Sequence, residues 1–134
     1  MKKILLSKLF FVTIVLTSVV VTNSAHAQKA FDNVTYKAKI NGNSALLALA
    51  DGYLPASRII IYSKQGNQVF TPDTAEPDRN GELQFNAVKG TRSYKNNRGS
   101  WLIVKGLSGS DLPSQIKAIY WDGKTRKNVV FKSE

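Results

Sequence analysis

Cysteine is absent from this chain of 134 residues, and histidine occurs only once, at position 26. The lack of cysteine excludes disulfides, a thiol nucleophile and the cysteine that carries a bacterial lipid anchor. The lack of any histidine after position 26 removes the usual catalytic triads and the ordinary zinc sites. The carboxylates that remain lie mostly in expected turns, not on strands that would line a cleft. We therefore expect no enzymatic activity and no cofactor.

The first 27 residues follow the pattern of a bacterial export signal. Lysines at positions 2, 3 and 8 precede an apolar run over residues 9–21, and Ala25-His26-Ala27 then matches the small-x-small site of signal peptidase. The run is too short for a membrane span, and no later stretch reaches its length. We expect cleavage after Ala27, no membrane span, and a single domain over residues 28–134 in the periplasm or outside the cell.

Negative charge is scarce in this chain, which has 19 lysines and arginines against 9 aspartates and glutamates. All nine acidic residues follow position 27, whereas three lysines precede it, so residues 28–134 keep 16 cations and a net charge of +7. Such a surface attracts anionic partners, or it serves only to keep a small protein soluble. The expected partners are an anionic glycan, lipopolysaccharide or an acidic protein, with nucleic acid ranked below them.

Alternation of polar and apolar residues indicates strands along the whole expected domain. The alternation is clearest over residues 82–88, and Asn41-Gly42 is a strong hairpin signal. The apolar run over residues 58–62 predicts a strand that is buried on both faces. Strands are expected at residues 34–40, 45–50, 58–62, 67–71, 82–88, 101–105, 115–121 and 127–132. The expected core includes Ile60, Leu83, Phe85, Trp101, Leu102 and Val104.

Three segments resemble motifs of bacterial immunoglobulin-like domains. They are Gly52-Tyr53-Leu54-Pro55-Ala56-Ser57 before a strand, Asp78-Arg79-Asn80-Gly81-Glu82-Leu83 at a turn, and Gly99-Ser100-Trp101 at the start of a later strand. The resemblance implies an all-β fold, namely a single immunoglobulin-like β-sandwich of seven or eight short strands. The chain departs from the antibody pattern because it has no cysteine pair. The resemblance implies an architecture and no particular function.

The loop before residue 83 is acidic and partly imitates a calcium-binding loop. Glu76, Asp78 and Asn80 alternate with other residues and are followed by a glycine, as oxygen ligands are in such loops. The match is incomplete, because the first position is glutamate and residue 87, where a bidentate glutamate belongs, is alanine. The sequence favours an ordinary acidic turn over a metal site.

Basic and aromatic residues gather in two other segments. Basic side chains supply charge for phosphates or sulfates, while aromatic rings stack on bases or sugars. We expect Trp101 to be a core residue, as a tryptophan on a strand of a small sandwich usually is, whereas for Tyr120 both a core and a binding role stay open. Tyr94, among polar residues, is as suited to binding as to packing. The candidate polyanion contacts are Lys89, Arg92, Tyr94, Lys95, Arg98, Lys124, Arg126 and Lys127.

These observations favour an exported, non-catalytic binding module that recognises an anionic polymer, surface or protein partner. The alternative is a periplasmic inhibitor or chaperone-like factor that pairs an exposed strand edge with a client. An enzyme comes third. Steep dependence of binding on salt distinguishes the first function, and loss of binding on placing a proline in an edge strand distinguishes the second.

Overall fold

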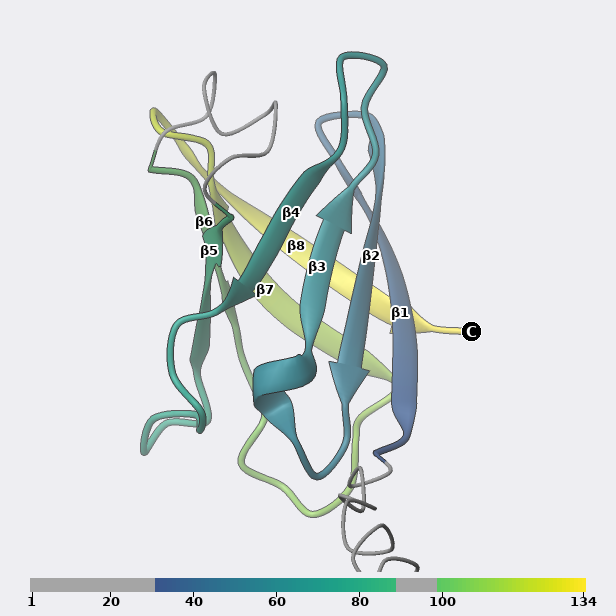
Figure 1. Cartoon of the computed structure of the whole chain (residues 1–134), viewed down its shortest axis with the longest axis vertical. Helices are drawn as coiled ribbons and strands as arrows, with labels where there is room; N and C mark the ends of the chain where they lie inside the picture. Colours follow the sequence, from purple (N-terminus) through teal and green to yellow (C-terminus); the bar gives the residue numbers. More distant parts are fainter. Residues whose placement is uncertain (1–30, 89–98) are drawn as a thin grey trace, which may run out of the picture. The chain divides into compact units, whose positions relative to one another are not determined.

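The strands expected from the sequence are all present in the computed structural model, which describes residues 31–88 and 99–134. One turn of 3-10 helix, η1 (Leu54–Ala56), precedes the third strand and is the only helix in the described residues. The expectation of an all-β protein with about eight strands is therefore confirmed. The strands are β1 (Asn33–Ile40), β2 (Asn43–Ala50), β3 (Arg58–Ile61), β4 (Gln68–Pro72), β5 (Leu83–Ala87), β6 (Trp101–Val104), β7 (Gln115–Trp121) and β8 (Arg126–Ser133) (Figure 1).

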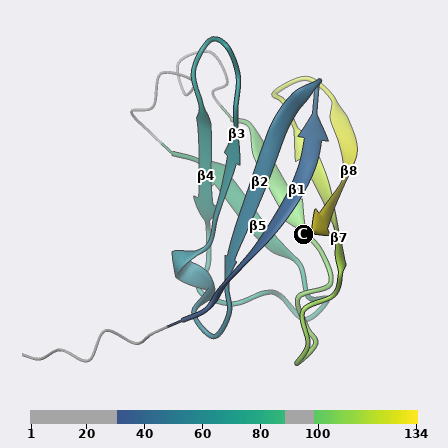
Figure 2. The ribbon, with the colours of Figure 1, turned by 90° about the vertical axis from the view of Figure 1, so that its right-hand side faces the viewer.

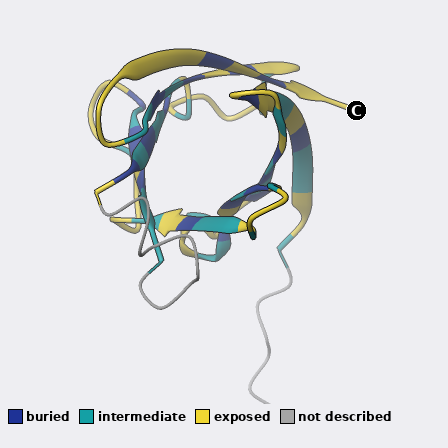
Figure 3. Ribbon diagram, turned by 90° about the horizontal axis from the view of Figure 1, so that it is seen from above, coloured by how far each residue is buried: buried dark blue, intermediate teal, exposed yellow. Residues whose placement is uncertain are grey.

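The eight strands close into one barrel, so the expectation of an immunoglobulin-like sandwich is wrong. Each strand pairs antiparallel with the next along the chain, and β8 pairs with β1. A sandwich needs connections that cross between two sheets, whereas here every connection joins neighbouring strands. Strand twist then curls the single sheet until its first and last strands meet, as in other up-and-down barrels. Figure 3 shows the resulting ring of strands from one end.

The first hairpin shows how local sequence sets the register. Asn41 and Gly42 have φ angles of 54° and 79°, the left-handed values that the tight turn between twisted strands requires. Ile40 consequently pairs with Asn43, and the ladder of β1 and β2 continues in register to Asn33 and Ala50. Because side chains alternate along a strand, this register decides which residues of β1 and β2 point inward.

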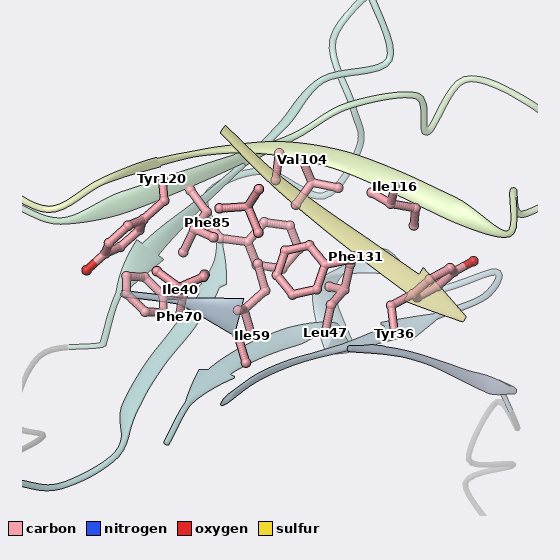
Figure 4. Packing of buried hydrophobic residues seen from close by; sticks show 14 of the residues in the cluster. Tyr36, Ile40, Leu47, Ile59, Phe70, Phe85, Val104, Ile116, Tyr120 and Phe131 are labelled. Carbon is pink, nitrogen blue, oxygen red and sulfur yellow. The ribbon is translucent and has the colours of Figure 1, made fainter. Parts of the chain in front are cut away.

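The barrel interior is a packed apolar core. Figure 4 shows Ile59, Phe85 and Phe131 converging from three different strands. Both Phe85 and Phe131 have exposed fractions of 0%, and each lies between strand neighbours that are more exposed. Of the core residues expected from the sequence, Leu83, Phe85, Leu102 and Val104 are confirmed, and Tyr120 is buried as well.

Two expected core residues, Ile60 and Trp101, lie instead on the outer face of the barrel. Both are partly exposed, whereas Ile59 and Leu102, their neighbours on the same strands, are fully buried. A barrel has one interior, so each strand buries only one face fully and apolar residues on its other face stay outside. The expectation that β3 is buried on both faces is therefore wrong.

Two phenols extend the core toward its ends. The Tyr36 hydroxyl donates a hydrogen bond to the carbonyl oxygen of Pro113 at 3.0 Å. The Tyr120 hydroxyl donates to Oε1 of Gln68 at a longer 3.4 Å. These bonds satisfy polar atoms that burial would otherwise make costly. Burial raises the pKa of both phenols, and the negative charges of Asp51 near Tyr36 and of Asp122 near Tyr120 raise it further.

The seam between β1 and β8 is the least extensive pairing of the barrel. Only Tyr36 with Ser133 and Lys37 with Lys132 are paired there, against eight residue pairs between β1 and β2. The ion pair of Lys37 with Glu134 lies beside these two pairs. Figure 2 shows the side of the barrel that carries β1, β8 and the C-terminus.

Candidate binding site on the outer face

One row of residues crosses four neighbouring strands on the outside of the barrel. Asn86 of β5 pairs with Trp101 of β6, Trp101 with Trp121 of β7, and Trp121 with Arg126 of β8. These positions alternate with buried residues such as Phe85, so all four side chains belong to the outer face. The register of the four strands thus brings together residues from position 86 to position 126.

The two indoles of this row are stacked, and the guanidinium lies over one of them. The ring centroids of Trp101 and Trp121 are 6.2 Å apart, and the ring planes are inclined by only 21°. The guanidinium carbon of Arg126 lies 5.7 Å from the centroid of the Trp101 ring. Since Arg126 is paired with Trp121 yet reaches Trp101, its side chain extends across the row. This contact is a cation–π interaction, which holds the cation over an aromatic face.

A second row beside the first is apolar in its middle and carries amides at its ends. Gln84 pairs with Ile103, Ile103 with Ile119, and Ile119 with Asn128. The amide of Gln84 donates a hydrogen bond from Nε2 to Oδ1 of Asn86 at 2.8 Å, which links the two rows. Both isoleucines are partly exposed, so the apolar surface begun by the indoles continues along the strands.

Beyond the isoleucines the same face becomes basic and slightly hollow. Lys105 follows Ile103 at the end of β6, and Lys117 precedes Ile119 on β7. Side chains of these two lysines, of Ile119 and of Asn128 line a groove of about 370 Å³ that also borders β8. The face therefore runs from an aromatic end, through an apolar middle, to a basic end.

The cations of this face differ in how far they are already neutralised. Nζ of Lys105 lies 2.9 Å from a carboxylate oxygen of Glu82, so its charge is partly compensated. Within residues 31–88 and 99–134, neither Lys117 nor Arg126 has an ion-pair partner. These two side chains therefore offer the charges on the face that are most available to an incoming anion.

The turn between β7 and β8 brings Lys124 next to the aromatic end, and Lys127 follows Arg126 on β8. Oδ1 of Asp122 accepts hydrogen bonds from the backbone N–H groups of Lys124 and Thr125, each at 2.8 Å. These bonds to the charged form lower the pKa of the Asp122 carboxyl. The ammonium of Lys127 lies 3.7 Å from the same carboxylate and also donates to Asn41. The charge of Lys127 is thus partly compensated by a carboxylate of the same chain, whereas Lys124 has no ion pair in the described part of the chain.

The structure places only part of the predicted polyanion site. Arg126 joins the aromatic row and Lys124 lies in the adjoining turn, while Lys127 points to Asp122 and Asn41. Five predicted contacts, Lys89, Arg92, Tyr94, Lys95 and Arg98, lie outside the described residues. The sequence reasoning missed the outward position of Trp101 and the roles of the amides on β5.

The predicted acidic loop has a different local structure from a ligand cage. Oδ1 of Asp78 accepts hydrogen bonds from the backbone N–H groups of Asn80 and Glu82, both at 2.9 Å. The hydroxyl of Thr74 donates to the carbonyl oxygen of Glu76. In the described ranges no three acidic side chains are grouped closely enough to hold a metal ion. Asp78 therefore acts as the cap of a turn, as Asp122 does in the β7–β8 turn.

No known protein family, curated protein or solved structure matches the chain. No helix in the described residues is long and apolar enough to cross a membrane.

Proposed function

We propose that this protein is an exported, non-catalytic binding module that recognises an anionic polymer through the outer face of β5–β8. The observation that carries the proposal is the row in which Arg126 lies over Trp101 beside Trp121. Large aromatic side chains are mostly buried when they serve only stability. Here two tryptophans and a cation share a partly exposed surface, a combination typical of recognition sites.

The cations on β7 and β8 support an anionic ligand on that side of the face, away from the pocket in which Gln84 and Ile103 adjoin the carboxylates of Asp73, Glu76, Asp78 and Glu82. Arg126 and Lys124 flank the aromatic end without carboxylate partners in the described residues, and Lys117 does so at the other end. Contacts of such cations with a polymer release its condensed counterions, so binding depends steeply on salt. The planar guanidinium of Arg126 also suits bidentate recognition of a carboxylate, phosphate or sulfate.

The experiment compares two double variants, each of which reverses two positive charges. Arg126→Glu with Lys124→Glu alters the proposed site, whereas Arg58→Glu with Lys64→Glu changes one exposed strand arginine and one exposed turn lysine elsewhere. Affinity for heparin is measured at several salt concentrations. The site variant is expected to flatten the dependence of affinity on salt by roughly one counterion for each lost contact, and the control much less. Equal losses in both variants would show that only net charge matters.

Export itself is part of the proposal. The basic start, apolar run and Ala25-His26-Ala27 site support a mature chain that begins at Gln28, in the periplasm or outside a bacterial cell. Mass spectrometry of the protein recovered from envelope and culture fractions tests this. A cytoplasmic protein that retains residues 1–20 would contradict it.

Pairing of a strand with the β1–β8 seam is the second candidate function. The hydrogen bond from the N–H of Ser133 to the carbonyl of Ser114 fixes which residues of β8 face β7. By alternation the backbone groups of Asn128 and Val130 face β1, where the ladder extends only to Lys37 and Lys132. An extended peptide can add to such an edge, and the lysines beside it favour acidic side chains.

Val130→Pro tests this second function, because it removes an N–H that points to the seam and not to β7. If seam pairing is the function, the variant is expected to retain the far-UV circular dichroism spectrum of a β protein and to lose binding of an extended acidic peptide. Unchanged peptide binding would contradict seam pairing. Peptide binding that fails with Arg126→Glu but survives Val130→Pro would place the contact on the outer face instead.

A further inference from the structure

The polarity of the outer face identifies the chemical class of the ligand more closely. We infer that this face binds an acidic polysaccharide, which lies along β6 and β7 from the tryptophan pair to Lys117. This inference rests on the proposed function and narrows it from any anionic polymer to one built of sugar rings. Its basis is that aromatic, apolar, amide and cationic groups follow one another in a fixed order along two adjacent strands.

The aromatic end suits a sugar ring. The flat faces of a pyranose expose C–H groups, which stack on the electron-rich faces of aromatic rings. Trp101 and Trp121 are stacked on each other, with an interplanar angle of 21°, so a sugar can stack on a ring face that the partner indole does not cover. Arg126 adds a guanidinium over Trp101, where it can donate hydrogen bonds to an acidic group carried by the same sugar.

The basic end lies at a distance that suits several linked sugars. Trp101 and Lys105 are four residues apart along β6 and the residue that follows it. Trp121 and Lys117 are also four residues apart, along β7. At about 3.3 Å per residue, each path is roughly 13 Å long. The groove of about 370 Å³ occupies the basic half of this length. A chain that stacks one sugar on the tryptophans thus reaches Lys117 with an acidic group of a later sugar.

The amides along the path match the hydroxyl groups of such a ligand. Gln84 and Asn86 are bonded to each other through one donor and one acceptor, so each amide retains further capacity to bond outward. Asn128 lies opposite them across the isoleucines and borders the groove. Sugar hydroxyls both donate and accept hydrogen bonds, whereas the phosphates of an inorganic polyphosphate only accept.

Single-stranded nucleic acid fits the same face less well. Proteins that bind it provide successive aromatic rings on which consecutive bases stack. In the described residues of this face, the two rings are stacked on each other in one row, and the next row has Ile103 and Ile119 in their place. The face therefore offers one aromatic stacking site followed by aliphatic side chains. This arrangement suits a polysaccharide, in which one sugar ring stacks and the next sugars contact the face with C–H and hydroxyl groups.

The experiment measures affinity for five probes by isothermal titration calorimetry at one moderate salt concentration. The probes are alginate oligomers, which carry carboxylates on sugars, heparin oligomers, which carry sulfates, inorganic polyphosphate, poly-L-glutamate and oligo-deoxythymidine. We expect at least one acidic polysaccharide to bind about tenfold or more tightly than polyphosphate and poly-L-glutamate, and the two saccharides distinguish carboxylate from sulfate. Equal affinity for polyphosphate would overturn this inference and leave the proposed function intact, whereas no binding of any probe would overturn both. Tighter binding of oligo-deoxythymidine would identify nucleic acid as the ligand.

Variants locate the two ends of the ligand. Trp121→Ala is expected to weaken binding of the preferred saccharide about tenfold while changing polyphosphate binding less than about twofold, because only sugars use the aromatic surface. Tyr62→Ala removes an exposed aromatic residue elsewhere, with an exposed fraction of 43%, and is expected to change the affinity for neither ligand.

Lys117→Gln tests the basic end. It is expected to weaken binding of both the saccharide and polyphosphate, whereas Lys39→Gln is expected to change neither affinity. Trp121→Phe, which keeps an aromatic ring, retains most saccharide binding. Unchanged saccharide affinity in a folded Trp121→Ala variant would contradict the inference.

Discussion

Three consecutive isoleucines of β3 provide a direct test of the barrel register. Ile59 and Ile61 have exposed fractions of 0% and 2%, whereas Ile60, between them, is partly exposed on the outer face. The three positions have the same residue type and are consecutive on the same strand. Replacement of each by alanine removes the same three carbon atoms and has the same effect on β-propensity. Any difference in stability therefore reports which face of the strand is buried.

The expected loss at Ile59 has two parts. Transfer of three buried methyl or methylene groups to water costs about 2.4 kcal/mol, at about 0.8 kcal/mol for each group. The cavity left among Phe70, Phe85 and the other core side chains adds to this, which brings Ile59→Ala to about 3–4 kcal/mol. Ile60→Ala leaves no cavity and exposes a group that is already partly in water, so its cost is about 1 kcal/mol or less.

The assay is equilibrium unfolding in urea, followed by tryptophan fluorescence and by circular dichroism. The slope of the free energy against urea should be the same in the two variants, so that the midpoints alone report the difference in stability. We expect Ile59→Ala to be less stable than Ile60→Ala by about 2 kcal/mol or more. Equal losses would mean that β3 is buried on both faces, and they would contradict the barrel described above.

The other predictions concern two glycines and three titrating groups. Gly81→Ala should destabilise the protein more than Gly42→Ala in the same unfolding assay: both positions have positive φ, but only at Gly81 would the new Cβ lie within 3.0 Å of the β6–β7 loop. The carboxyl of Asp122 should titrate below its ordinary pKa by NMR, so its stabilisation is present above pH of about 4 and is lost as pH falls through the lowered value. Tyr36 and Tyr120 should ionise above the ordinary tyrosine pKa of about 10 in an absorbance titration, so stability falls as pH rises above about 10, where the unfolded chain ionises first.

The positions of the strands could be predicted from the sequence because they depend on local information. Alternation within each segment and the turn residues between segments fix where a strand begins and ends. Asn41-Gly42 and the turn at Asp122 are examples in which two or three residues determine a hairpin. The secondary structure was therefore predicted to within a few residues for all eight strands.

Closure of the barrel could not be predicted in the same way. A sandwich and a barrel use the same alternation and the same strand number, and they differ in which distant strands pair. Here the distinguishing contact is between β1 and β8, and it consists of two residue pairs about one hundred positions apart. The segments that resembled immunoglobulin-like motifs contain turns that a barrel uses as well, such as the one capped by Asp78.

The candidate site depends on which face of β6 carries Trp101, and the sequence contains the information that decides this. Over residues 101–105 every position but the last is apolar, so alternation within the run does not show which face is buried. Lys105, however, belongs outside, and residues two apart share a face, so Ile103 and Trp101 lie outside with it. The assignment of Trp101 to the core relied on the average behaviour of tryptophan and ignored this neighbour. Had the lysine been used to set the face, the pairing of Trp101 with Trp121 would have followed from the hairpin register alone.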